Sequence, residues 1–212
     1  DDFAHEVAIL SLWLAEHQMN QEFKKLFGNC TPTLPLKDSG NIVCGNATRL
    51  DWEEVCPKNE GDEIYILGNP PYLGARLQTK EQKEDMNIVF DGIDGFNNLD
   101  YISCWFYKAT KYLQNYSKNQ FAFVSTNSIT QGTQVSLLWS HLLNNDIEIS
   151  FAHQSFKWTN NAKNNAGVVV VIIGLRNKKN TPKYIFNKEI KIQSKNINPY
   201  LIDADNIYIK DS

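Results

Sequence analysis

The tetrapeptide Asn69-Pro70-Pro71-Tyr72 is the segment of this sequence best suited to chemistry on a planar ligand. Two consecutive prolines fix φ and remove two backbone donors, so the carbonyl oxygens there are rigid and lack strand partners. The Asn69 side chain adds an oxygen acceptor beside these carbonyls, and Tyr72 adds an aromatic face. The turn is therefore suited to holding a planar base that carries an amino group.

The chemistry that such a turn supports is methyl transfer to nitrogen. If the Asn69 side-chain oxygen and the Pro70 carbonyl accept the two N–H bonds of the amino group, its nitrogen moves toward sp3 character. The freed lone pair can then attack a methyl sulfonium, with the protein contributing positioning and electrostatics. Tyr72 would stack on the base, which must be flipped out of a duplex to reach the turn. The alternative is that the tetrapeptide is only a proline turn. Its position directly after an apolar strand favours a functional role over this alternative.

The elements that must position this turn alternate along the chain. Apolar runs predict strands over residues 63–67, 120–125, 148–156 and 168–175, with a short strand end at 41–44. Helical spacing predicts helices over residues 3–27, 99–113 and 135–143, and a short one over 51–55. Residues 73–98 are polar and rich in Gly and Asn, and we expect a loop there. This order indicates an α/β fold, in which ligands bind at strand ends.

The bulk composition suits a globular protein without a general affinity for nucleic acid. Hydrophobic residues make up 42% of the 212-residue chain, and the formal net charge is −3. Any basic groove must therefore be local, and for the lysines at 178, 179, 183 and 188 a solvated surface is favoured over phosphate contact. The four cysteines form no CxxC pair, which predicts a reducing cytoplasm and no metal site. No apolar run is long enough to predict a membrane span.

Several further phrases, taken together, are more specific than the tetrapeptide alone. They are residues 15–20 (AEHQMN), 32–36 (PTLPL), 42–52 (IVCGNATRLDW), 68–74 (GNPPYLG), 99–109 (LDYISCWFYKA), 123–129 (FVSTNSI) and 156–168. With them the chain resembles the N6-adenine branch of the bacterial amino-methyltransferases. It further resembles the methyltransferase segment of large single-chain restriction–modification enzymes similar to MmeI. The resemblance implies a Rossmann-like class I core that uses S-adenosylmethionine and double-stranded DNA.

The resemblance also assigns roles to individual positions. Asn69, Pro70, Pro71 and Tyr72 would be catalytic, and Tyr72 together with Phe156 or Trp158 would stack on the base. Residues expected at the cofactor are Asp1, Asp2, Asn46, Ala47, Asn69 and Asp100. Asn46 departs from the pattern, because an aspartate is usual there. Thr126 and Asn127 would end the next strand near the active site.

The expected Gly-rich cofactor loop is absent from this sequence, so the core is expected to be partial. In this branch of the family that loop lies upstream of Asp1, and the chain, which begins without methionine, is expected to be a piece of a longer protein. We expect a partial catalytic domain at 1–176 and a linker or extension at 177–212. Target-recognition and nuclease domains of the same polypeptide would lie outside it.

Two other functions compete with adenine methylation of DNA. The first is methylation of a protein glutamine, since such enzymes also carry the same tetrapeptide. The second is a degenerate module that binds DNA or acts as a scaffold, which the missing Gly-rich loop and Asn46 favour.

Overall fold

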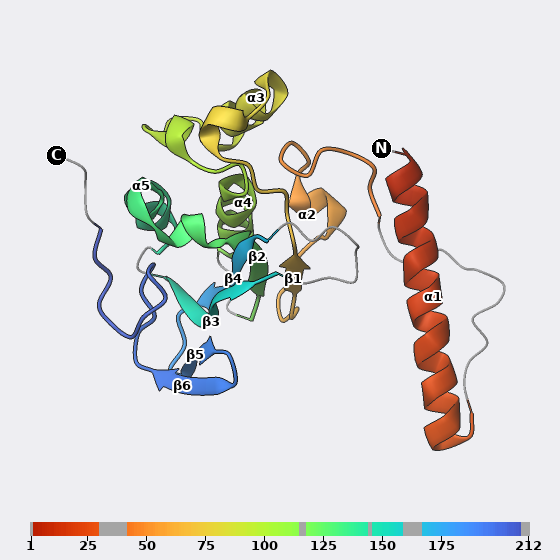
Figure 1. Cartoon of the computed structure of the whole chain (residues 1–212). Coiled ribbons are helices and arrows are strands. Elements are labelled where there is room, and N and C mark those ends of the chain that lie inside the picture. The colour runs from red at the N-terminus through yellow and green to blue at the C-terminus, as the bar shows by residue number, and fades with distance from the viewer. Residues whose placement is uncertain (1, 30–41, 115–117, 144–145, 159–166, 209–212) are drawn as a thin grey trace. The chain divides into compact units, whose positions relative to one another are not determined.

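The computed structural model of the chain (Figure 1) describes residues 2–29, 42–114, 118–143, 146–158 and 167–208. It divides into two compact units, Asp1–Lys58 and Asn59–Ser212. Among the described residues, no helix combines the length and the apolar character needed to cross a membrane.

The first unit consists of a long helix and a short one. α1 (Asp2–Phe27) confirms the helix predicted over 3–27, but none of its side chains is buried, and apolar residues such as Phe3 and Leu26 are exposed. α2 (Trp52–Val55) begins at Asp51, whose side chain accepts a hydrogen bond from the Glu53 N–H at 2.8 Å. The strand end predicted at 41–44 is wrong for residues 42–44, which form no strand.

The second unit contains a mixed six-stranded sheet in the order β1-β2-β4-β3-β5-β6. The strands are β1 (Tyr65–Gly68), β2 (Gln120–Thr126), β3 (Ile147–Lys157), β4 (Val169–Asn177), β5 (Lys183–Asn187) and β6 (Ile190–Ser194). β1 runs parallel to β2, β4 runs antiparallel to both β2 and β3, and β5 runs parallel to β3. The four predicted strands are thus confirmed, and the fold is α/β as expected.

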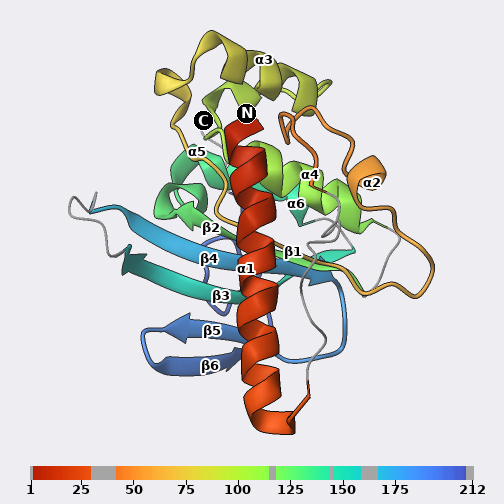
Figure 2. The ribbon, with the colours of Figure 1, turned by 90° about the vertical axis from the view of Figure 1, so that its right-hand side faces the viewer.

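Helices cover one face of this sheet (Figures 1 and 2). They are α4 (Ser103–Leu113), α5 (Gly132–Gln134) and α6 (Ser140–Leu142), with a π-helical turn at Val135–Trp139. α3 (Lys80–Val89) packs against α4, farther from the sheet (Figure 2). In the core, the Phe106 ring of α4 packs edge-on against Phe121 and Phe123 of β2, at centroid distances of 5.9 and 5.3 Å. Trp139 is fully buried, and its indole N–H donates to the Ile129 carbonyl at 2.7 Å.

Two segments differ from the sequence prediction. The loop expected at 73–98 contains α3, which begins with a capping box: Thr79 accepts from the Gln82 N–H, and the Gln82 side chain accepts from the Thr79 N–H. The helix expected at 135–143 is instead a π turn between two short α-helical turns.

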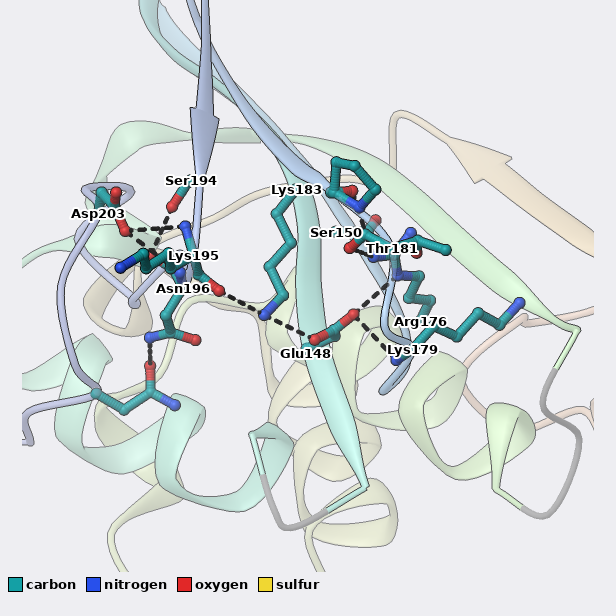
Figure 3. A network of polar contacts seen from close by, with 12 residues as sticks. Glu148, Ser150, Arg176, Lys179, Thr181, Lys183, Ser194, Lys195, Asn196 and Asp203 are labelled. Atoms are coloured by element: carbon teal, nitrogen blue, oxygen red, sulfur yellow. Dashed lines mark hydrogen bonds and ion pairs between the residues drawn. The ribbon is translucent and has the colours of Figure 1, made fainter.

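The segment after residue 176 belongs to the sheet. The expected division at 176/177 falls inside β4, and β5 and β6 extend the same sheet beyond β3. A buried ion cluster fixes β5 there (Figure 3). The Glu148 carboxylate accepts from Arg176 Nε and from Lys183 Nζ, both at 2.9 Å, and Lys183 also donates to the Lys195 carbonyl. These contacts join three strands and the turn that follows β6.

Candidate active site

The Asn69-Pro70-Pro71-Tyr72 turn begins where β1 ends, at the carboxyl edge of the sheet. Gly68, the last residue of β1, pairs with Phe123 in the parallel strand β2. Pro70 is buried, Tyr72 is half-buried, and Asn69 and Pro71 are exposed. Among the described residues, no hydrogen bond is recorded to the Asn69 side chain or to the Pro70 carbonyl. Neither oxygen of the predicted amino-group site is thus used by a hydrogen bond within the described part of the chain.

Asp100 holds the backbone that follows this turn. Its Oδ1 accepts from the Leu73 N–H at 2.8 Å and from the Ile102 N–H at 3.2 Å. The Tyr101 N–H in turn donates to the Leu73 carbonyl at 3.0 Å. Burial raises the pKa of the Asp100 carboxyl above its ordinary value, although the two backbone donors oppose that shift. Asp100 thus positions the turn against the start of α4, and both recorded bonds use only one of its carboxylate oxygens.

Two glutamines complete this arrangement, and sequence reasoning missed both. Gln78 is buried, and its Nε2 donates to the carbonyls of Leu73 and Leu99 at 3.2 and 2.9 Å. Gln134, from α5, accepts from the Asp100 N–H at 3.0 Å. The residues around each glutamine in the sequence do not predict this role, because the backbone groups that the glutamines bind come from distant parts of the chain.

The next strand brings a second group of polar residues to the same edge. β2 runs parallel to β1 and ends at Thr126, whose hydroxyl lies 2.6 Å from that of Ser128. Asn127 starts a 3-10 turn (Asn127–Thr130), and its carbonyl accepts from the Thr130 hydroxyl at 2.8 Å. Because parallel strands end at one edge, Thr126 and Asn127 lie on the side of the sheet where the predicted catalytic turn lies.

The two candidate stacking aromatics are also at this edge. In the sheet register Phe156 pairs with Val170, and Val170 pairs with Thr126. Trp158 continues the β3–β4 pairing, with its N–H donating to the Val168 carbonyl at 2.9 Å. Both aromatics are half-buried, so the geometry does not select one of them. The loop at 159–166 lies outside the described residues.

The remaining cofactor candidates belong to the unit Asp1–Lys58. Asn46 forms a tight turn in which its Oδ1 accepts from the N–H and the hydroxyl of Thr48, at 3.0 and 2.7 Å. The Ala47 carbonyl accepts from the Trp52 indole at 2.8 Å. The Asp2 carboxylate accepts from the Cys44 thiol at 3.5 Å. Asp1 lies outside the described residues.

Comparison with known proteins identifies similar chains. The family model described as "MmeI, DNA-methyltransferase domain" matches residues 1–187. DNA methyltransferase A of Bacillus subtilis (strain 168) is 53% identical over 213 residues, covering 99% of this chain and 24% of its own length. The solved structure of the Type IIL restriction–modification enzyme MmeI in complex with DNA is 42% identical, with a TM-score of 0.88 over 98% of this chain. This chain spans 28% of that protein, so it corresponds to about a quarter of each relative.

Proposed function

Because the chain belongs to the family of MmeI DNA-methyltransferase domains, we propose that it transfers a methyl group from S-adenosylmethionine to the N6 amino group of adenine in double-stranded DNA. The membership confirms the predicted resemblance and the Rossmann-like methyltransferase core. The proposal concerns the reacting base, the cofactor and the residues that act on them. We also propose that this domain is part of a larger restriction–modification polypeptide in the bacterial cytoplasm.

The observation that carries the proposal is the pair of acceptors after β1 that have no hydrogen-bond partner among the described residues. The Asn69 side-chain oxygen and the Pro70 carbonyl, both without recorded partners in the described part of the chain, would each accept one N–H of the adenine amino group. Those two bonds orient the nitrogen lone pair and favour the pyramidal geometry that develops in the transition state. Half-buried Tyr72 supplies the stacking face, with Phe156 or Trp158 from the β3–β4 hairpin on the other side.

The residues present fit S-adenosylmethionine through Asp100. Its Oδ1 is committed to the Leu73 and Ile102 backbone, while no bond to Oδ2 is recorded among the described residues. That oxygen suits an amino or hydroxyl group of the cofactor. Asp1, Asp2, Asn46 and Ala47 are the further candidates from the first unit. The cofactor, when bound, supplies an electrophilic methyl group on a sulfonium.

The decisive experiment replaces Asn69 in the full-length enzyme. With Asn69→Ala, transfer of tritiated methyl to DNA should fall by about 10²–10³-fold or more, the usual loss for a group that stabilises only the transition state. Asn180→Ala is the matched control, because Asn180 is an exposed asparagine in the turn between β4 and β5. Full activity in Asn69→Ala would refute the mechanism.

The same assay tests the competing functions. Hydrolysis of the labelled DNA followed by mass spectrometry should give N6-methyladenine as the sole modified base. Label in protein rather than DNA would indicate a glutamine methyltransferase. A full-length enzyme that binds DNA and transfers no methyl group to either substrate would indicate a degenerate module.

A further inference from the structure

The tip of the β5–β6 hairpin points to the same edge of the sheet as the catalytic turn. β5 is parallel to β3, with His153 pairing with Phe186, and β3 runs toward the edge where β1 and β2 end. Figure 2 shows the β5–β6 turn on the same side as the arrowhead of β3. The tip is formed by residues 187–190, between the two strands. The hairpin therefore reaches the carboxyl edge four strands away from β1.

The tip end of this hairpin, residues 187–191, carries an excess of one positive charge in a chain of net negative charge. It contains two lysines, Lys188 and Lys191, and one acidic residue, Glu189, whereas the whole chain carries −3. Arg176 and Lys183, at the other end of β4 and β5, share the single negative charge of buried Glu148. Lys188 and Lys191 are both exposed, and a local excess of positive charge favours polyanions.

These two lysines differ in how they are held at the tip end of the hairpin. Lys188 is exposed in the turn itself, with a left-handed φ of 55°. Lys191 is exposed on β6, and its ammonium lies 3.9 Å from the centroid of the Tyr184 ring. Beside them the Phe186 ring stacks on His153 at 4.5 Å, which fixes the hairpin to β3. The Lys191 ammonium thus lies against an aromatic ring of a hairpin that is paired with β3.

We propose that Lys188 and Lys191 bind phosphates of the DNA backbone beside the flipped adenine. The proposal rests on the function proposed above, because it takes the duplex to lie along the carboxyl edge. Four strand spacings separate β1 from β5, and at about 4.8 Å each this is roughly 19 Å. Since phosphates recur every 3.4 Å or so along one strand, the tip meets the backbone about five or six nucleotides from the target base.

The chemistry of this surface fits phosphate rather than base edges. Lysine presents a point charge that recognises phosphate without reading sequence. The hairpin would therefore anchor and orient the duplex, while sequence is read elsewhere in the full-length enzyme. The acidic residue of the tip is Glu189. The Asp203 carboxylate accepts from the Lys195 and Asn196 N–H groups, in the turn after β6 at the other end of the hairpin.

The test removes both charges in the full-length enzyme. Lys188→Asn suits the left-handed backbone, and Lys191→Gln keeps the side-chain length. Lys118→Gln with Lys178→Gln is the matched control, because both are exposed lysines at the opposite edge of the same sheet. Binding of a labelled duplex is measured by fluorescence anisotropy from low to high salt, without methyl transfer.

The variant lacking both tip lysines should bind roughly 5- to 10-fold more weakly per lost contact near 0.1 M salt, and the slope of log K against log salt should flatten by about two. The loss should be equal for duplexes with and without the recognition sequence. An unchanged slope, or an equal loss in the control pair, would overturn the proposal. Because binding is the readout, failure of adenine methylation would leave this result intact.

Discussion

Two polar side chains at opposite edges of the sheet differ in whether they have hydrogen-bond partners. At the carboxyl edge, the Asn69 side chain is exposed and has no partner among the described residues. At the opposite edge, the Glu148 carboxylate is 6% exposed and binds two cations, and it also accepts from the Lys179 N–H at 3.3 Å (Figure 3). The first arrangement leaves hydrogen-bonding capacity for a ligand, while the second uses it to hold strands together.

We expect this contrast to separate a residue that positions the turn from one that binds the ligand. Asp100 lies between the two extremes, since it is adjacent to the predicted catalytic turn but its Oδ1 already accepts from two backbone donors. The expected cost of removing each side chain follows from this order. Stability should suffer most at Glu148, less at Asp100 and least at Asn69, whereas methyl transfer should be most sensitive to Asn69.

The largest loss of stability is expected for Glu148→Ala. It would leave Arg176 and Lys183 without a counter-charge, although their side chains are only 12% and 14% exposed. Breaking a buried pair in this way costs about 3–5 kcal/mol. The free energy of unfolding from urea denaturation measures the loss, with Glu189→Ala at the exposed hairpin tip as the control. A loss below about 1 kcal/mol would show that the cluster is not structural.

An intermediate loss is expected at Asp100. Asp100→Ala would deprive the Leu73 and Ile102 N–H groups of their acceptor, which costs about 1–3 kcal/mol for buried donors. Asp100→Asn keeps a side-chain oxygen in place and should cost less. If Asp100→Ala and Asp100→Asn both unfold at the same urea concentration as the unsubstituted protein, the two hydrogen bonds do not hold the turn.

The raised pKa of Asp100 also predicts a pH dependence. Between the ordinary pKa of 3.8 and the raised pKa, the unfolded chain has lost a proton that the folded protein still binds. The free energy of unfolding contributed by this group should therefore fall as pH rises from the ordinary pKa to the raised pKa, and stay lower above it. Asp100→Asn should lack this slope, which urea denaturation from pH 4 to 7 would detect. An identical slope in both proteins would assign it to other groups.

The elements predicted correctly from the sequence are those whose pattern lies within one short segment. The strands around Ile66, Phe123 and Ile173 were predicted because each is a continuous apolar run, and the position of the tetrapeptide follows from the first of them. α3 was missed because it is mostly polar, with only Asp85 and Met86 buried. Its capping box was the readable signal, and that signal was outweighed by the surrounding Gly and Asn residues.

The parts that the sequence did not predict depend on contacts between distant segments. Gln78 and Gln134 stabilise the site by binding backbone groups, and nothing in their neighbourhood distinguishes them from surface glutamines. Asp100 was placed at the cofactor by resemblance, but its bond to Leu73, 27 residues away, became visible only in the fold. The pairing of β5 with β3 was missed for the same reason.

The smallest loss of stability is expected for Asn69→Ala, the substitution that should be most harmful to catalysis. An exposed side chain without a recorded partner in the described part of the chain contributes little to folding, so the free energy of unfolding should change by no more than about 0.5 kcal/mol. Urea denaturation of this variant beside Asn180→Ala measures the difference. A destabilisation near that of Asp100→Ala would mean that Asn69 supports the turn itself, and the contrast between the two edges would then no longer distinguish a ligand site from a structural cluster.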